Sequence, residues 1–265
     1  MNTTRVQKFM FNGHLISYQK FGMGVSVLLA FHGFGQSGQV FAPLETWQSG
    51  RFTVFAIDLF FHGDSYYQDS RLLTKSDWNR LLAAFLMEQQ INRFSLAGFS
   101  LGGRFALAAV EVFADRIDQL ILLAPDGITR SFWYQLATSS ATGRGLFRYA
   151  LQHLSLINGL GHTLTRLGLL NRTVMRFAEI SLGTTEQREL VYQSWTQFRL
   201  IQPDLTLLSY LLNRYPIQVR FVIGALDRIV PGSYILPLTN RLMHYQLTSL
   251  RTGHNHLIEL LAEQL

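Results

Sequence analysis

The chain has 265 residues, of which 48% are hydrophobic and 15% are charged, which suits either one large α/β domain or two smaller ones with a buried core. It contains no cysteine, which excludes a disulfide framework, a thiolate nucleophile and any cysteine-based metal site. No run approaches about 18 uninterrupted apolar residues, and the start lacks the apolar core of a secretory signal. We therefore expect a cytoplasmic protein.

The net charge of +6 is concentrated in one part of the chain. Residues 128–220 contain ten arginines, no lysine and four acidic residues, so this segment carries the whole excess and the remainder is neutral. Such a sharp shift in composition predicts a separate structural layer.

Strand and helix patterns alternate along the first half of the chain. Residues 6–12 and 15–21 predict an N-terminal hairpin around Gly13. Continuous apolar runs of strand length, typical of strands buried on both faces, follow. They lie at residues 25–31, 52–57, 93–97, 119–124, 218–224 and 245–250. Helical periods lie at residues 40–47, 76–89, 104–113, 233–243 and 256–263.

This alternation predicts an α/β fold with a mostly parallel central sheet of about eight strands, covered by helices on both faces. The alternation of strands and helices stops for about ninety residues, whose pattern is helical and which are rich in leucine, arginine and aromatic residues. We therefore expect a core domain formed by residues 1–127 and 216–265, with a helical insertion at residues 128–215.

A serine flanked by glycines stands between one of these strands and its helix. Gly98-Phe99-Ser100-Leu101-Gly102 has the G-x-S-x-G pattern of a nucleophile elbow, in which the serine occupies a sharp turn from strand to helix. The glycines lack a Cβ, so strand and helix can pass close together. Alone, the pattern is also compatible with a glycine-rich turn that carries an incidental serine.

Other reactive side chains follow further strands. Because the carboxyl ends of parallel strands meet at one edge of the sheet, we expect these groups to gather there. They are His32-Gly33-Phe34, the stretch from Asp58 to Ser65, Ser100, Asp126, Asp227 and His254. A serine, candidate acids and a histidine thus occur in the order Ser, Asp, His, which is the chain order of the α/β-hydrolase triad.

On these motifs the chain resembles the α/β-hydrolase fold family over nearly its whole length, apart from the insertion. Gly98 to Gly103 matches the family's elbow, and His32-Gly33-Phe34 matches its oxyanion loop. Asp58 to Ser65 resembles the loop D-x-P-G-H-G-x-S, with phenylalanine in place of both the proline and the first glycine. Leu226 to Pro231 resembles the acid loop, and Gly253-His254 the histidine loop.

The resemblance implies a role for each site residue. Ser100 would be the nucleophile, His254 the general base and Asp227 the acid that orients the histidine. The main-chain N–H groups of Phe34 and Leu101 would hold the oxyanion.

Alternatives to these assignments remain. Asp126, which follows the preceding strand, is a second candidate for the acid, although Asp126-Gly127 also reads as an ordinary turn. His256 is expected to open the last helix, and His32 and His62 to organise loops by hydrogen bonding. No cluster has metal-ligand spacing, and we expect neither a metal nor a cofactor.

The resemblance implies a serine hydrolase that cleaves a carboxylic ester or thioester through an acyl-enzyme, with a small or lipid-like apolar substrate. The insertion would form a cap that selects the substrate, and its arginines could hold an anionic group or form a solvated face. This basic cap could also rest on an anionic membrane surface, whereas no nucleic-acid motif occurs.

Two alternative functions fit the same fold. Gly98 to Arg104 also resembles the elbow of the synthase of menaquinone biosynthesis, a lyase in which the triad acts as a base and arginines hold carboxylates. The second alternative is a binding protein without catalytic activity.

Overall fold

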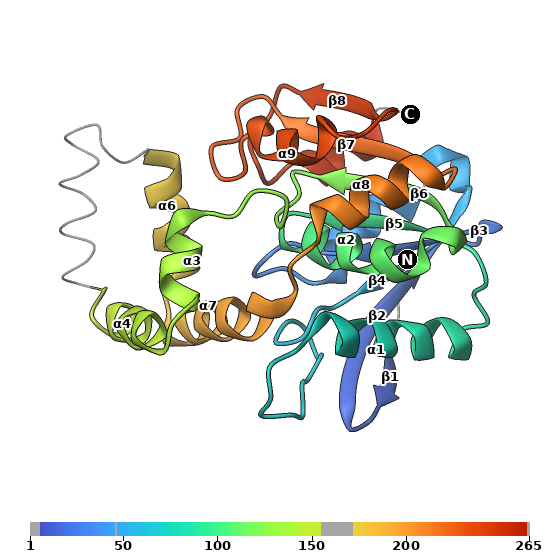
Figure 1. Cartoon of the computed structure of the whole chain (residues 1–265). Helices are drawn as coiled ribbons and strands as arrows, with labels where there is room; N and C mark the ends of the chain where they lie inside the picture. Colours follow the sequence, from blue (N-terminus) through green and yellow to red (C-terminus); the bar gives the residue numbers. More distant parts are fainter. Residues whose placement is uncertain (1–5, 46, 155–171, 264–265) are drawn as a thin grey trace. The chain divides into compact units, whose positions relative to one another are not determined.

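A computed structural model describes residues 6–45, 47–154 and 172–263. They form an eight-stranded sheet with helices packed against it (Figure 1), which confirms the α/β fold class. The strands are β1 (Gln7–Phe11), β2 (His14–Phe21), β3 (Ser26–Phe31), β4 (Phe52–Ile57), β5 (Phe94–Phe99), β6 (Ile117–Leu123), β7 (Gln218–Gly224) and β8 (Gln246–Leu250). Their order in the sheet is β1-β2-β4-β3-β5-β6-β7-β8.

The sheet is antiparallel at one edge only. β2 pairs antiparallel with both β1 and β4, whereas β3 to β8 pair in parallel with their neighbours. All six residues of the central strand β5 are buried, as expected for a parallel strand covered on both faces. The carboxyl ends of β3, β5, β6, β7 and β8 therefore lie along one edge.

Helices cover both faces of this sheet. The helices of the unit that holds the sheet include η1 (Gly38–Glu45), α1 (Lys75–Glu88), α2 (Leu101–Phe113), α8 (Leu205–Arg214), α9 (Leu236–Thr239) and α10 (Leu257–Glu263). On one face, Leu28 and Ala30 of β3 share a buried cluster with Phe41 of η1 and Leu257 of α10. On the other, Phe31 packs edge-on against Trp78 of α1, with ring centroids 5.3 Å apart.

One helix starts close to its predicted first residue, and another starts three residues earlier than predicted. α1 begins at Lys75, where Thr74 forms a capping box with Asp77, close to the predicted start at residue 76. α2 begins at Leu101 and not at Arg104, so it starts directly after Ser100. The glycines at 102 and 103 lower helix propensity, which is why the sequence pattern placed this start three residues late.

The chain divides into two compact units, Met1–Thr129 with Ile201–Leu265, and Arg130–Leu200. The predicted insertion extended to residue 215, but the second unit ends at Leu200, because α8 packs against α2 of the sheet-containing unit. Leu208 and Leu212 of α8 are buried. A helical pattern alone does not reveal which unit a helix joins.

The unit Arg130–Leu200 has an aromatic interior of its own. Its described helices are α3 (Phe132–Thr138), α4 (Ala141–Gln152), α6 (Arg172–Ser181), α7 (Thr185–Gln197) and the short η4 (Phe198–Leu200). Trp195 of α7 packs against Tyr134 of α3 and Phe147 of α4, with ring centroids 5.2 and 5.1 Å apart. Across the part of the chain that the structure describes, no helix is both long and apolar enough to cross a bilayer.

Candidate active site

Ser100 sits on a strained turn between β5 and α2. Its backbone has φ 49° and ψ −116°, a conformation that side-chain-bearing residues adopt only when their surroundings enforce it. A Cβ added at Gly102 would collide with the main-chain carbonyl of Phe31 on β3, so glycine is required for α2 to start this close to the sheet. The elbow geometry expected from the sequence is thus present.

The structure brings Ser100, His254 and Asp227 into one hydrogen-bonded chain. The Ser100 hydroxyl lies 3.0 Å from His254 Nε2, and His254 Nδ1 lies 2.6 Å from Asp227 Oδ2. A neutral imidazole that donates its Nδ1–H to the carboxylate leaves Nε2 free to accept the serine proton. The three residues are far apart in sequence but meet at the carboxyl ends of β5, β7 and β8.

The acid and the histidine are both buried and held in place. The other oxygen of Asp227, Oδ1, accepts the main-chain N–H groups of Ile229 and Val230 at 2.8 and 3.0 Å. The imidazole of His254 packs against the ring of Phe99, with centroids 5.0 Å apart. These contacts fix the direction in which Nε2 points.

The alternative residues have other partners. Asp126, the second candidate for the acid, accepts a hydrogen bond from Arg104 Nη2 on Oδ2 at 2.5 Å and the N–H of Gly127 on Oδ1 at 2.7 Å. His256 is exposed, and its Nδ1 lies 2.8 Å from Glu259 Oε2 in α10. His254 pairs with Asp227, so the geometry favours Asp227 as the acid.

The two expected oxyanion donors come from two segments, the start of α2 and the loop after β3, the strand that pairs with β5. Leu101 is the first residue of α2, where a main-chain N–H has no acceptor within the helix. Phe34 follows β3, in a loop that is closed by Gln36, whose Oε1 accepts the N–H of Gly33 at 3.1 Å. The role of Gln36 was not predicted, because no sequence pattern signals a side chain that folds back onto its own loop.

Two buried histidines support this loop. His32 Nδ1 donates to the carbonyl of Gly33 at 2.7 Å, and its Nε2 accepts the N–H of Leu59 at 2.9 Å. Burial, assisted by the neighbouring His62, lowers the pKa of His32 to about 3. Burial also lowers the pKa of His62, whose ring packs edge-on against Phe34. Both histidines are therefore neutral groups that organise the loops, as the resemblance implied.

The loop after β4 keeps its hydrogen bonds despite its two phenylalanines. Asp58 accepts the Gly38 N–H on Oδ1 at 2.6 Å and the Ser17 hydroxyl on Oδ2, and the Ser65 hydroxyl donates to its carbonyl at 2.8 Å. Phe61, which replaces the first glycine of the motif, has φ 68°. It adopts the left-handed conformation in which glycine is favoured, so this turn carries local strain.

Several arginines of the second unit bind carbonyls within that unit. Arg144 Nη1 donates to Thr138 O at 3.0 Å, and Arg199 Nη1 donates to Thr196 O at 2.5 Å. The guanidinium of Arg148 lies 5.3 Å from the ring centroid of Tyr192. Part of the predicted basic character of the insertion thus serves its own packing. Arg166 lies outside the described residues.

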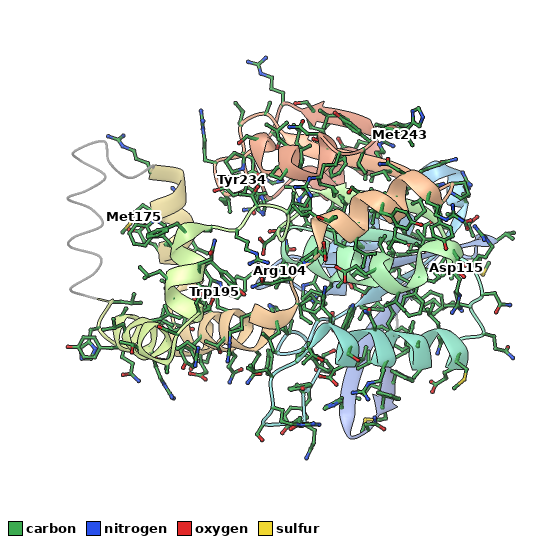
Figure 2. The ribbon with its side chains drawn as sticks, in the orientation of Figure 1. Arg104, Asp115, Met175, Trp195, Tyr234 and Met243 are labelled. Carbon is green, nitrogen blue, oxygen red and sulfur yellow. The ribbon has the colours of Figure 1, made fainter. Side chains whose placement is uncertain are left out.

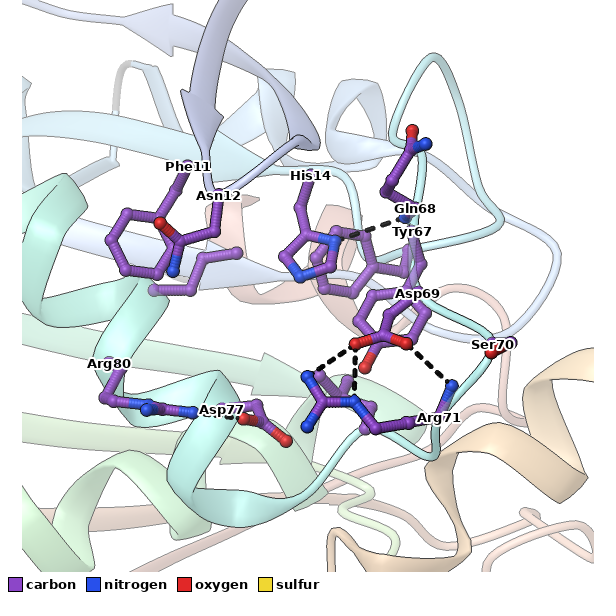
Figure 3. A pocket seen from close by; sticks show the side chains of 13 residues that line it. Phe11, Asn12, His14, Tyr67, Gln68, Asp69, Ser70, Arg71, Asp77 and Arg80 are labelled. Atoms are coloured by element: carbon purple, nitrogen blue, oxygen red, sulfur yellow. Dashed lines mark hydrogen bonds and ion pairs between the residues drawn. The ribbon is translucent and has the colours of Figure 1, made fainter.

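A separate cavity of about 430 Å³ lies beside the β1–β2 turn and the start of α1 (Figure 3). His14 and Tyr67 stack in its wall with ring centroids 4.6 Å apart, and Asp69 pairs with Arg71 at 2.7 Å. Its lining includes none of the residues that form the hydrogen-bonded chain around Ser100.

Comparisons with known proteins agree with this architecture. A family model described as alpha/beta hydrolase fold matches residues 26–259. A pimeloyl-[acyl-carrier protein] methyl ester esterase of Aliivibrio salmonicida is 34% identical over 99 residues, which are 37% of this chain and 36% of that protein. An uncharacterized protein of Mycobacterium tuberculosis is 31% identical over 121 residues, 45% of this chain and 34% of the relative.

These alignments span only about a third of the curated relatives' length. The crystal structure of a hydrolase from Pseudomonas aeruginosa superposes with a TM-score of 0.68 at 18% identity, covering 97% of this chain and 94% of the other. The family model spans most of the chain, from β3 to α10, and the chain therefore belongs to the α/β-hydrolase fold family.

Proposed function

We propose that this protein is a serine hydrolase that cleaves a carboxylic ester or thioester through an acyl-enzyme. The observation that carries the proposal is the hydrogen-bonded chain from the Ser100 hydroxyl through His254 to Asp227. Serine hydroxyls are weak nucleophiles, and a base within hydrogen-bond distance is what activates them.

In the proposed reaction, Ser100 Oγ attacks the carbonyl carbon of the substrate while its proton passes to His254 Nε2. Asp227 stabilises the imidazolium, and the N–H groups of Phe34 and Leu101 hold the negative oxygen of the tetrahedral intermediate. The proton then passes from His254 to the departing alcohol or thiol, which leaves an acyl-serine. Water attacks this acyl group with His254 again as the base, releases the carboxylic acid and restores Ser100.

An apolar acyl group is the substrate feature that we favour. Phe34 and Leu101, the proposed donor residues, have apolar side chains that are only partly buried. A relative with 34% identity over a part of the chain is named as a methyl ester esterase, which supports ester chemistry without naming the substrate of this protein.

The test is a panel of p-nitrophenyl esters and acyl thioesters of increasing chain length, assayed with the wild type and with Ser100→Ala. We expect the substitution to lower kcat on the order of 10⁴- to 10⁶-fold, because it removes the nucleophile. Ser95→Ala is the matched control, since it removes a hydroxyl from the same strand, and it should retain activity.

A fluorophosphonate probe provides a second measurement, because it labels an activated serine whatever the natural substrate is. Labelling of the wild type and not of Ser100→Ala would support the proposal. Equal hydrolysis by both proteins, or no labelling of the wild type, would contradict it, and the second result would favour a binding protein.

A further inference from the structure

The main chain of Ser100 is attached to the end of the neighbouring strand β6. Its N–H donates to the carbonyl of Leu123 at 2.9 Å, and its carbonyl accepts the N–H of Asp126 at 2.8 Å as well as that of Gly103 at 2.9 Å. The position of the nucleophile therefore depends on the segment that follows β6, not only on β5 and α2.

That segment is itself strained. Ala124 has φ 40°, a left-handed conformation that is unfavourable for alanine, and it directly precedes Pro125, which restricts its backbone further. Its N–H donates to the carbonyl of Val222 on β7 at 2.8 Å. A strained turn persists only when its surroundings fix it, so something must hold this segment against the elbow.

The start of α2 and the segment after β6 fit closely together. A Cβ added at Gly103 would lie 2.6 Å from Pro125 Cβ, so only glycine allows this approach. Gly127 has φ 99°, and a Cβ there would lie 3.2 Å from Cβ and Cγ of Arg104. Gly103-Arg104 and Pro125-Asp126-Gly127 are thus complementary in shape.

An ion pair joins the same two segments. Arg104, which is labelled in Figure 2, stands one helical turn after Ser100 with a side chain that is only 6% exposed. Its Nη2 lies 2.5 Å from Asp126 Oδ2. The N–H of Gly127 occupies Asp126 Oδ1 at 2.7 Å, so the carboxylate is held at both oxygens. A charge as buried as that of Arg104 requires such a counter-charge.

We propose that Arg104 and Asp126 are positioning residues, which clamp the segment after β6 onto the start of α2 and thereby fix Ser100 and the N–H of Leu101. This inference rests on the proposed function. The ion pair acts through the hydrogen bond from the Asp126 N–H to the Ser100 carbonyl, and neither side chain needs to touch the substrate.

The competing role for Arg104 is to bind a carboxylate of the substrate. That role is disfavoured because the guanidinium already has Asp126 as its counter-charge. A substrate carboxylate at this place would also face the negative charge of Asp126, at a cost in binding free energy.

The experiment compares the wild type, Arg104→Lys, Arg104→Met, Asp126→Asn and the double variant Arg104→Met/Asp126→Asn. Two p-nitrophenyl esters are used, one with a neutral acyl chain and one whose acyl chain ends in a carboxylate. Rates of fluorophosphonate labelling and melting temperatures are measured in parallel. Lys75→Gln is the matched control, because it breaks the ion pair of Glu111, which lies on the same helix but away from Ser100.

We expect the single variants to lower kcat about 10- to 100-fold on both esters with little change in KM, and to slow labelling similarly. Arg104→Lys, which keeps the charge, should retain more activity than Arg104→Met. The double variant should be no worse than the poorer single variant, because both residues act through one contact. If Arg104→Met does not fold, the cycle is made with Arg104→Lys.

Other results would overturn the inference. A rise in KM confined to the ester with a carboxylate would make Arg104 a substrate-binding residue. A fall in melting temperature with unchanged kcat and labelling, as expected for Lys75→Gln, would leave the pair a purely structural role. A wild type without Ser100-dependent hydrolysis or labelling would overturn the proposed function, and this inference with it.

Discussion

His32 should make the protein lose stability in acid. Its imidazole is fully buried, and its two nitrogens are satisfied only in the neutral form, by the Gly33 carbonyl and the Leu59 N–H. Burial, followed by the nearby His62, lowers its pKa from 6.5 to about 3. The unfolded chain therefore takes up this proton at a higher pH than the folded chain does.

The size of the effect follows from that difference. Stability is fully present above pH 6.5 and declines by about 1.4 kcal/mol for each pH unit below it, until the folded protein is protonated near pH 3. The loss is about 2 kcal/mol at pH 5 and about 4 kcal/mol at pH 3, a large part of the stability of an ordinary domain.

The assay is urea-induced unfolding of the wild type and of His32→Gln between pH 4 and pH 7. The substitution should lower the free energy of unfolding at pH 7, because the imidazole and its hydrogen bonds are lost. The free energy of unfolding of His32→Gln should depend less steeply on pH than that of the wild type, by up to about 1.4 kcal/mol per pH unit. Carboxylates titrate in both proteins, so the difference reports His32 together with its coupling to His62, whose ring centroid lies 5.0 Å away. Parallel curves would refute the reasoning.

Three further predictions concern single substitutions. Asp227→Asn should lower kcat on the order of 10⁴-fold with little change in melting temperature, because the amide no longer favours the required tautomer; a kcat within tenfold of the wild type would contradict the assigned role. Gly102→Ala should lower the free energy of unfolding in urea by about 1–3 kcal/mol, because the added Cβ meets the Phe31 carbonyl. Gly145→Ala is the control, since Gly145 is exposed on α4 with open space around it, and it should be neutral or stabilising by up to about 1 kcal/mol. Phe61→Gly should be more stable than Phe61→Val by about 1–2 kcal/mol, because valine tolerates φ 68° poorly; equal urea midpoints would count against strain at this position.

Much of the sheet could be predicted because its strands are buried on both faces. β7 has the predicted bounds, residues 218–224, and β3 differs from the prediction by one residue. An apolar run of this length between two helical periods is typical of a parallel strand that is buried on both faces. The fate of α8 could not be predicted in the same way, because an amphipathic pattern shows that a face is buried but not what buries it.

The site, like the fold, has parts that could be predicted from the sequence and parts that could not. Ser100 could be recognised because the close approach of β5 and α2 requires glycines beside it, and these glycines form a pattern in the sequence. The strand pattern alone did not separate Asp126 from Asp227, since each acid follows a parallel strand; only the resemblance of Leu226 to Pro231 to the acid loop favoured Asp227. The choice depends on whether Arg104 or His254 lies nearer, and such distances between residues remote in sequence are set by the complete fold.

The hydrogen bond between Ser100 and His254 joins positions 154 residues apart, and Asp227 also comes late in the chain. During synthesis the elbow strand and its helix emerge well before the base and the acid. Under the proposed mechanism, a nascent chain that has folded as far as β6 carries its nucleophile in an unactivated state. Reactivity toward cellular esters would then switch on only when β7 and β8 join the sheet, which links the onset of activity to completion of the fold.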